Sequence, residues 1–320
     1  MASEAPFSST SKIYVAGHRG LAGSAIHRNL VSQGYKNLVL RAHRELDLRN
    51  QAATQAFFEK EKPEVVFLSA AKVGGIFAND KFRGDFILEN LQIQTNVISS
   101  AFSTEVKKLV FLGSSCIYPK FAKQPIVEAE LLTGALEPTN DAYAVAKIAG
   151  LMLCQSLMRQ YGCSFISLMP TNLYGPGDNY DLDNSHVLPA LIRKFHEAKI
   201  SSSPTVTCWG SGTPLREFMY SEDLGDAVVF CAQRYNEPEH MNVGSEQELT
   251  ILELAKLVSE IVGFTGKIVW DSSKPDGTPR KRMDSSRLHV LGWRPKFSLR
   301  QGIALSYQDF LSRNQDLPVR

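Results

Sequence analysis

The feature that most constrains the fold of this chain is a short apolar run that stops at a glycine and gives way at once to a helical pattern. The run is IYVA at residues 13–16, and apolar residues at helical spacing begin at Leu21. Between them lies a turn, GHRGLAG, that extends from Gly17 to Gly23. A strand, a glycine turn and a helix in this order are typical of the first unit of a parallel α/β sheet.

Further short apolar runs follow in the first half of the chain, with helical stretches between most of them. They are residues 37–40, 65–68, 109–112 and 164–168. Short runs that are apolar throughout and separated by helices predict strands that are buried on both faces. We therefore expect an α/β fold in which residues 12–173 form a doubly wound parallel sheet of the Rossmann type.

Beyond residue 170 the alternation of strands and helices becomes irregular. Residues 174–186 are rich in Gly, Asn, Asp and Pro and predict a loop at the mouth of the sheet. Residues 189–198 and 251–262 predict helices, the second capped by Thr250, and residues 205–209 predict a strand. We expect residues 174–320 to form mainly a smaller C-terminal α/β lobe that binds substrate, with some segments returning to the Rossmann domain.

Composition and charge exclude several classes of protein. The 320 residues are 43% hydrophobic, and 35 Lys and Arg balance 33 Asp and Glu to a net charge of +2, so no overall field attracts nucleic acid or an anionic membrane. No apolar run approaches the length of about 18 residues that a membrane span needs. Residues 1–11 lack the features of a targeting signal and predict a short disordered tail.

The five cysteines give no sign of a metal site or of a disulfide framework. They are widely spaced, without a CxxC pattern, at Cys116, Cys154, Cys163, Cys208 and Cys231. An odd number of scattered cysteines fits a reducing compartment. We expect no metal and a cytoplasmic location.

The glycine turn is a candidate dinucleotide site, because backbone N–H groups at a helix N-terminus bind a pyrophosphate. Close packing of strand against helix is the alternative, since the spacing is GxxGxxG rather than GxGxxG. Where NAD-binding proteins usually carry an acid after the second strand, this chain has Arg41, His43 and Arg44. Together with Arg19, these cations favour the 2′-phosphate of NADP, and a solvated basic turn is the alternative.

Tyr143 and Lys147 lie four residues apart in a helical segment, which places them on one face. A phenol has an unperturbed pKa of about 10, so we expect the ammonium of Lys147 to lower the pKa of Tyr143 towards neutrality. Ser114 follows the run at 109–112, where strand ends line the ligand crevice. The alternatives are an exposed helix face for the Tyr–Lys pair and an ordinary turn residue for the serine.

Together, the glycine turn, the serine at the strand end and the YxxxK helix resemble the extended short-chain dehydrogenase/reductase family, from residue 12 to about residue 293. The longer strings AGHRGLAGSAI, AAKVGGI, FLGSSCIYPK, LEPTNDAYAVAKIAG, NSHVLPALIRKFHEA, WGSGTPLREF and KPDGTPRK resemble a narrower group within it. Members of that group act on GDP-4-keto-6-deoxy-D-mannose. The resemblance implies an NADPH-dependent enzyme that inverts C3 and C5, then reduces C4 to give GDP-L-fucose, and a homodimer.

The same resemblance assigns roles to individual residues. Cys116 and His186 exchange protons at C3 and C5, Tyr143 delivers a proton to the C4 oxygen, Ser114 holds that oxygen, and Lys147 contacts the nicotinamide ribose. Without the resemblance, Cys116 is equally compatible with a small buried hydrophobe, and His186 with a surface histidine.

Cofactor contacts are implied at the glycine turn, the basic turn and the following strand ends. These residues are Gly17, His18, Arg19, Gly20, Leu21, Ala22, Gly23, Arg41, Arg44, Leu112, Gly113, Ser114, Ser115, Lys147, Pro170, Thr171, Asn172, Leu173 and His186. Contacts to the GDP-sugar are implied at Lys194, Trp209, Arg216 and Asp276, with Arg216 as the expected pyrophosphate partner.

Three other functions fit part of the pattern. An NAD-retaining nucleotide-sugar 4-epimerase would carry the missing acid after the second strand. A 4,6-dehydratase would carry an Asp-Glu pair where this chain has Ser115 and Cys116. A non-catalytic NADP-binding sensor would usually have lost the tyrosine or the lysine, and both are present here. The sequence therefore favours the epimerase-reductase.

Overall fold

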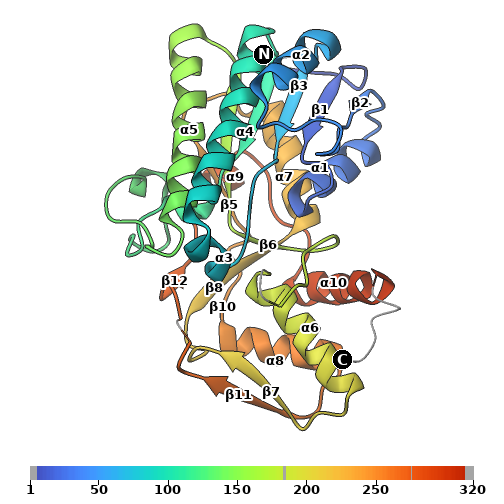
Figure 1. Ribbon diagram of the computed structural model, residues 1–320, viewed down its shortest axis with the longest axis vertical. Coiled ribbons are helices and arrows are strands. Elements are labelled where there is room, and N and C mark those ends of the chain that lie inside the picture. The colour runs from blue at the N-terminus through green and yellow to red at the C-terminus, as the bar shows by residue number, and fades with distance from the viewer. Residues whose placement is uncertain (1–5, 183–184, 275, 314–320) are drawn as a thin grey trace.

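The computed structural model describes residues 6–182, 185–274 and 276–313 and has two parts along its long axis (Figure 1). The larger part contains a six-stranded sheet between two layers of helices, and the smaller part contains short strands and three helices. Within the described residues, no helix is long and apolar enough to cross a bilayer. No group of three metal-ligating side chains is found among them either.

The six-stranded sheet is entirely parallel, with the order β2-β1-β3-β4-β5-β9. Its strands are β1 (Ile13–Ala16), β2 (Leu38–Val39), β3 (Val65–Leu68), β4 (Lys108–Leu112), β5 (Phe165–Pro170) and β9 (Met241–Val243). The order reverses between β1 and β3, and ligands of open α/β sheets bind at the carboxyl ends of strands at such a reversal. The expected doubly wound sheet is confirmed, and the glycine turn that follows β1 lies at the reversal.

Helices cover both faces of this sheet because its strands are apolar on both sides. Ile13 and Val15 of β1 belong to one buried cluster, whereas Tyr14 and Ala16 belong to the other. The first cluster lies under α1 (Leu21–Ser32), α7 (Ser221–Arg234) and α9 (Ser286–Val290). The second lies under α2 (Gln51–Glu61), α4 (Arg83–Ser103) and α5 (Asp141–Tyr161). Thus α7, α9 and β9, from the second half of the chain, complete this part.

The smaller part is built around β8 (Leu215–Tyr220), which pairs with β10 (Glu248–Thr250), β12 (Arg280–Lys281) and β6 (Asn172–Tyr174). A separate parallel pair consists of β7 (Thr205–Trp209) and β11 (Lys267–Asp271). Its helices are α6 (Val187–Ile200), α8 (Ile251–Val262) and α10 (Leu299–Arg313), and they share a third buried cluster with these strands. The remaining helix, α3 (Ile76–Lys81), precedes α4.

Local details follow the sequence closely in some places and depart from it in others. Thr250 caps α8 as expected: its hydroxyl accepts the N–H of Glu253 at 3.1 Å, and the Glu253 carboxylate accepts the N–H of Thr250 at 2.8 Å. The expected tail differs. Residues 1–5 lie outside the described part, but Phe7 is only 5% exposed, because its ring packs against Tyr35 and Phe67. The domain boundary at residue 173 stays a prediction.

Candidate active site

The glycine turn after β1 is tight enough to require glycine at two positions. Gly17 has φ +86°, and a Cβ there would lie 2.7 Å from the backbone nitrogen of Ala70. A Cβ at Gly23 would lie 2.2 Å from the carbonyl oxygen of Gly17. The same glycine turn can therefore both pack closely against its neighbours and bind an anion. Gly20 precedes α1 without a capping side chain, which leaves the N–H groups of the first helical turn available to a phosphate.

An unpaired polar atom supports a ligand at this turn. His18 Nδ1 is buried and has no hydrogen-bond partner among the described residues. Burial, together with the charge of Arg19, lowers the pKa of His18, so the ring is neutral and can donate or accept one bond at each nitrogen. A buried group of this kind usually has a partner, and a bound dinucleotide would provide one.

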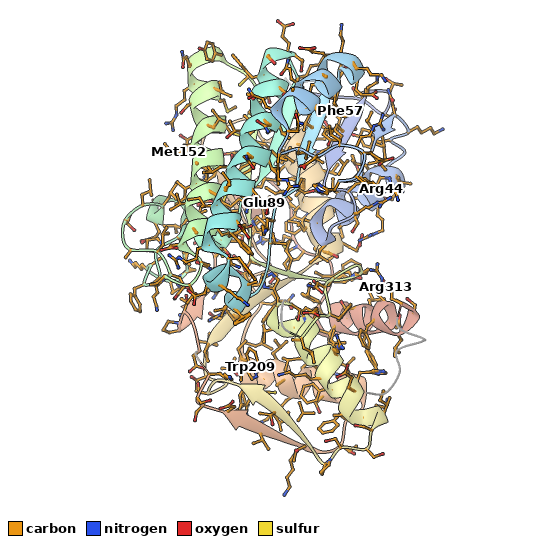
Figure 2. The ribbon with its side chains drawn as sticks, in the orientation of Figure 1. Arg44, Phe57, Glu89, Met152, Trp209 and Arg313 are labelled. Atoms are coloured by element: carbon orange, nitrogen blue, oxygen red, sulfur yellow. The ribbon has the colours of Figure 1, made fainter. Side chains whose placement is uncertain are left out.

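The basic turn after β2 offers fewer free cations than the sequence suggests. Arg41 pairs with Glu61 of α2 at 2.6 Å and lies 5.7 Å from the centre of the Phe57 ring. Arg19 and Arg44 have exposed side chains, and neither forms an ion pair within the described residues. Arg44 lies near the edge of the molecule in Figure 2. The 2′-phosphate site is therefore best served by Arg19 and Arg44, with Arg41 held partly by Glu61.

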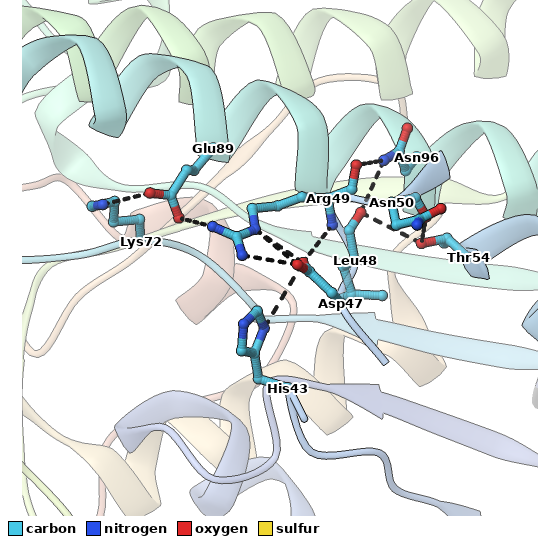
Figure 3. A network of polar contacts seen from close by, with 9 residues as sticks. All are labelled: His43, Asp47, Leu48, Arg49, Asn50, Thr54, Lys72, Glu89 and Asn96. Atoms are coloured by element: carbon cyan, nitrogen blue, oxygen red, sulfur yellow. Dashed lines mark hydrogen bonds and ion pairs between the residues drawn. The ribbon is translucent and has the colours of Figure 1, made fainter. Parts of the chain in front are cut away.

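His43 belongs to a polar network and does not stand as an independent cation. Its Nδ1 lies 3.9 Å from Asp47, which accepts a 2.8 Å bond from Arg49 (Figure 3). Arg49 continues to Glu89 at 3.1 Å, and Glu89 accepts a 2.5 Å bond from Lys72. This chain of contacts ties the basic turn to α4 and to the segment after β3.

Tyr143 and Ser114 meet at the carboxyl end of β4. Tyr143 lies in the first turn of α5, and its hydroxyl is close enough to the Ser114 side chain for that side chain to act on the pKa of the tyrosine. Lys147, one turn further, is 3% exposed, and its Nζ donates to the carbonyl of Leu112 at 2.9 Å. The Lys147 Nζ is 5.8 Å from the centre of the Tyr143 ring. The three residues expected to carry the reduction are thus together, and the alternative of an exposed helix face does not hold.

The expected effect of Lys147 on Tyr143 is not found in the protein alone. Burial raises the pKa of Tyr143, Cys116 nearby raises it further, and the Ser114 side chain only partly opposes them. Burial also lowers the pKa of Lys147 to about 7, and its amine is directed to the Leu112 carbonyl. The prediction of a lowered tyrosine pKa was wrong because it neglected desolvation. The phenol is held in its protonated form, which suits a proton donor.

Cys116 has polar partners and is not a small buried hydrophobe. It lies in a 3₁₀ turn, Ser115–Ile117, where its Sγ accepts from Asn140 Nδ2 at 3.4 Å and from Lys281 Nζ at 3.5 Å. By contrast, burial raises the pKa of the Cys154 thiol to about 12 and makes that residue inert.

Lys281 was missed by sequence reasoning, although it also faces His186. It lies on β12, 165 positions after Cys116, inside the string KPDGTPRK. His186 is exposed at the N-terminus of α6, and the surrounding protein and the charge of Lys281 both lower its pKa. Lys281 therefore contacts Cys116 directly, and its charge also acts on His186. No local sequence pattern indicates the position of Lys281, because the pairing of β12 with β8 brings it to the site.

The four residues expected to bind the GDP-sugar gather in the smaller part. Trp209 is 53% exposed, so it is not a core residue, and Lys194 and Lys274 lie 5.0 and 5.4 Å from its ring centre. Lys274 was not foreseen. Arg216 Nη2 donates to the carbonyl of Asp276 at 3.3 Å.

The carboxylate of Asp276 is already used within the protein. It accepts the N–H of Ser211 at 2.7 Å and the Ser211 hydroxyl at 2.8 Å. Asp276 therefore shapes the loop between β7 and β8, and its backbone orients Arg216. Burial lowers the pKa of Arg216, with the carboxylates of Asp276 and Glu137 acting in the opposite direction.

The remaining predicted cofactor residues lie at adjacent strand ends. The N–H of Gly113 donates to the carbonyl of Leu168 at 2.9 Å, and a Cβ at Gly113 would strike the Met169 side chain. After β5, Thr171 is buried and the amide of Asn172 donates to the carbonyl of Glu217 at 2.8 Å. Because β4 and β5 are neighbours, the segments 112–115 and 170–173 lie at one edge of the sheet.

Comparison with known proteins places the chain in a family. The model of the NAD dependent epimerase/dehydratase family matches residues 13–244. The chain belongs to this family. A protein named GDP-L-fucose synthase 1 from Arabidopsis thaliana is 62% identical over 302 residues, which is 94% of each chain. The resemblance drawn from the sequence is confirmed.

Solved structures agree with this membership. A GDP-6-OMe-4-keto-L-xylo-heptose reductase from C. jejuni has a TM-score of 0.93 and 41% identity, covering 96% of this chain and 99% of its own. A GDP-L-fucose synthetase from Naegleria fowleri, solved with NADP bound, has a TM-score of 0.89 and 30% identity over 98% of each chain.

Proposed function

We propose that this protein converts GDP-4-keto-6-deoxy-D-mannose to GDP-L-fucose by 3,5-epimerisation followed by NADPH-dependent reduction at C4. The observation that carries the proposal is the meeting of two sets of groups at one strand end. Tyr143 lies close enough to Ser114 and to Cys116 for both side chains to affect its pKa. The relative from Arabidopsis thaliana named GDP-L-fucose synthase 1 supports the substrate and the product.

Reduction uses the protonated phenol. NADPH supplies the hydride when it is bound. Tyr143, whose pKa burial raises, donates the proton to the C4 oxygen as charge develops there, and Ser114 hydrogen-bonds the same oxygen. Lys147 has a pKa of about 7, so it exchanges protons readily at neutral pH. It can therefore supply a proton that replaces the one Tyr143 has donated.

Epimerisation uses Cys116 and His186. The 4-keto group makes the hydrogens on C3 and C5 acidic, so a base can remove each one and an acid can return a proton on the opposite face. Lys281 Nζ donates to Cys116 Sγ at 3.5 Å, and the lowered pKa of His186 keeps the imidazole neutral at physiological pH.

The cofactor residues favour NADP over NAD. The N-terminus of α1 binds the pyrophosphate, His18 Nδ1 offers a buried partner, and Arg19 and Arg44 meet the 2′-phosphate. The segments 112–115 and 170–173 hold the nicotinamide end. The NADP bound to the Naegleria fowleri relative supports this assignment.

The GDP moiety is held in the smaller part. Lys194, Lys274 and Arg216 supply three cations for a diphosphate, and the exposed Trp209 ring, over which both lysines lie, offers an apolar face at the same place. Asp276 keeps the Ser211 loop and Arg216 in position through its carboxylate and its carbonyl.

The functional unit is proposed to be a cytoplasmic homodimer. Helices α4 and α5 carry large apolar side chains on their outer surface: Leu88 is 57% exposed, Val145 44% and Met152 41%. Met152 points away from the body of the molecule in Figure 2. Pairing of α4 and α5 with the same helices of a second copy would cover all three side chains.

One experiment tests substrate, reaction and cofactor together. The purified protein is incubated with GDP-4-keto-6-deoxy-D-mannose and either NADPH or NADH, and the products are separated and identified by NMR. We expect GDP-L-fucose, with NADPH strongly preferred. A reduced 6-deoxy sugar that keeps the D configuration would contradict the epimerisation, and unchanged substrate with constant nicotinamide absorbance would contradict the enzyme assignment.

A further inference from the structure

Glu217 on β8 is a carboxylate in an unusual place. It is 0% exposed, and its two oxygens bind different backbone segments: Oε1 accepts the N–H of Glu246 at 2.7 Å and Oε2 accepts the N–H of Met283 at 3.0 Å. The Thr171 hydroxyl donates to the backbone carbonyl of Glu217 at 3.4 Å and not to its carboxylate. Among the described residues, backbone N–H groups, and no cation, bind the carboxylate.

A buried carboxylate without a cation is costly, and burial accordingly raises the pKa of Glu217. An apolar residue in its place would leave the buried N–H groups of Glu246 and Met283 without acceptors. The neighbouring backbone is fitted to the carboxylate: a Cβ at Gly244 would lie 2.4 Å from Glu217 Oε1. The two acceptor oxygens therefore fix the positions of two backbone segments.

Three functional segments meet at Glu217. Its own carbonyl accepts the amide of Asn172 at 2.8 Å, within the run that is proposed to hold the nicotinamide end. The preceding residue, Arg216, is the proposed pyrophosphate partner. The Glu217 carboxylate accepts the N–H of Met283, which follows Lys281 by two positions on the segment that leaves β12.

The position of Lys281 depends on a short element. Strand β12 has two residues and pairs with β8 only at Arg280 with Leu215 and at Lys281 with Arg216. After Lys281, a side chain of β8 binds the segment again at Met283, where Glu217 accepts the backbone N–H. The segment is also held from the other side, where Gln124 accepts the N–H of Arg282 at 3.0 Å and Ile126 donates to the Arg282 carbonyl at 2.8 Å. Glu217 is therefore the anchor on the β8 side, and its loss would loosen the segment relative to Cys116; a shift of about 1 Å at a reacting group can cost about a hundredfold in rate.

We propose that Glu217 is a positioning residue for the epimerisation: its carboxylate anchors the backbone at Met283 and so holds Lys281 against Cys116. This proposal rests on the function proposed above. It assigns to Glu217 no contact with substrate or cofactor. It predicts that the two half-reactions respond differently to loss of the carboxylate, because the reduction uses Tyr143 and Ser114 and does not use Lys281.

The test is Glu217→Gln, which keeps the shape but replaces one acceptor oxygen with an NH₂ group that faces an N–H donor. Two rates are measured. The first is deuterium uptake from D₂O at C3 and C5 of the 4-keto substrate. The second is single-turnover oxidation of GDP-L-fucose by NADP⁺, which reports the C4 step without epimerisation. We expect deuterium uptake to fall at least tenfold and the oxidation to change less than threefold.

A double-mutant comparison tests whether Glu217 acts through Lys281. In a Lys281→Ala background, Glu217→Gln should cause little further loss of deuterium uptake, because the group that it positions is gone. Glu246→Gln is the matched control: it removes a carboxylate from the same cluster but keeps the N–H that binds Glu217, and it should leave both rates unchanged. If Glu217→Gln does not fold, Glu217→Asp is measured in the same way.

Outcomes that overturn the proposal are distinct from failure of the proposed function. Equal losses in both rates would make Glu217 a purely structural residue, and unchanged deuterium uptake or fully additive losses with Lys281→Ala would also overturn the proposal. Absence of deuterium uptake in the unaltered protein would instead contradict the function itself.

Discussion

At the scale of single residues, burial decides the chemistry of this site more than charge does. Lys147 is buried and Tyr143 half-buried, and desolvation favours the neutral forms of both: the pKa of the phenol rises and that of the amine falls to about 7. A neutral phenol next to Ser114 is ready to donate a proton. The site therefore binds a ketone with its acid already in the required form.

We predict that Tyr143→Phe abolishes NADPH oxidation but preserves deuterium uptake at C3 and C5. The substitution removes the proton donor for the C4 oxygen, whereas the proton exchange depends on Cys116 and His186. Parallel measurement of nicotinamide absorbance and of deuterium by NMR checks this. Loss of both activities together would show that the two half-reactions share the phenol.

We predict that Lys281→Met shifts the acid limb of the deuterium-uptake profile to higher pH. The charge of Lys281 lowers the pKa of His186, so the imidazole stays neutral to a pH below its usual range. Without that charge the pKa of His186 rises, and the base becomes protonated at a higher pH. Rates measured between about pH 4 and pH 8 check the direction, since histidine normally titrates near 6.5. An unmoved acid limb would place Lys281 away from the histidine.

At the scale of elements, patterns within one segment were predictable and contacts between segments were not. The runs of β1, β3 and β4, and the cap of α8, follow from apolar periodicity and local hydrogen bonding. Arg41 was expected to face a phosphate, but Glu61, on the neighbouring helix α2, holds it at 2.6 Å. Lys281 carries no local signal because strand pairing alone brings it to Cys116. Contacts made by side chains from distant strands could not be predicted from the single sequence.

We predict that Gly23→Ala destabilises the protein and weakens NADPH binding, because the new Cβ would lie 2.2 Å from the Gly17 carbonyl oxygen. Overpacking of this kind typically costs about 1–3 kcal/mol. Gly84→Ala is the matched control, since Gly84 also lies in a helix, with nothing within 4 Å of its Cβ position, and the change should be neutral or stabilising by up to about 1 kcal/mol. Chemical denaturation and NADPH titration measure both effects. Equal behaviour of the two variants would contradict a tight turn.

At the scale of the whole molecule, the site is a product of both parts. The sheet of the larger part supplies Ser114, Cys116 and the cofactor turn, and the smaller part supplies Lys281, Arg216 and His186. The change in rhythm after residue 170 led us to expect a smaller lobe that binds substrate, and the bounds of the two domains stay a prediction. The sequence did not indicate that a lysine from β12 would contact Cys116.

We predict that Val145→Glu converts a homodimer to a monomer. Val145 is 44% exposed on α5, and a carboxylate in a helix-to-helix interface would be buried without a partner. Light scattering after size-exclusion chromatography gives the mass, and Val290→Glu is the control, since Val290 is 89% exposed on α9. A wild-type protein that is monomeric at micromolar concentration would contradict the proposed pairing of α4 and α5.

The central claim is that one site performs both proton exchange and reduction, and isotope content of the product tests it most directly. The reaction is run in D₂O with unlabelled NADPH, using the unaltered protein and Cys116→Ser. We predict that the unaltered protein gives GDP-L-fucose with deuterium at both C3 and C5 and with hydrogen from NADPH at C4, and that Cys116→Ser gives no GDP-L-fucose. A reduced product from the unaltered protein without deuterium at C3 and C5 would contradict the account, because the protein would then be a reductase alone.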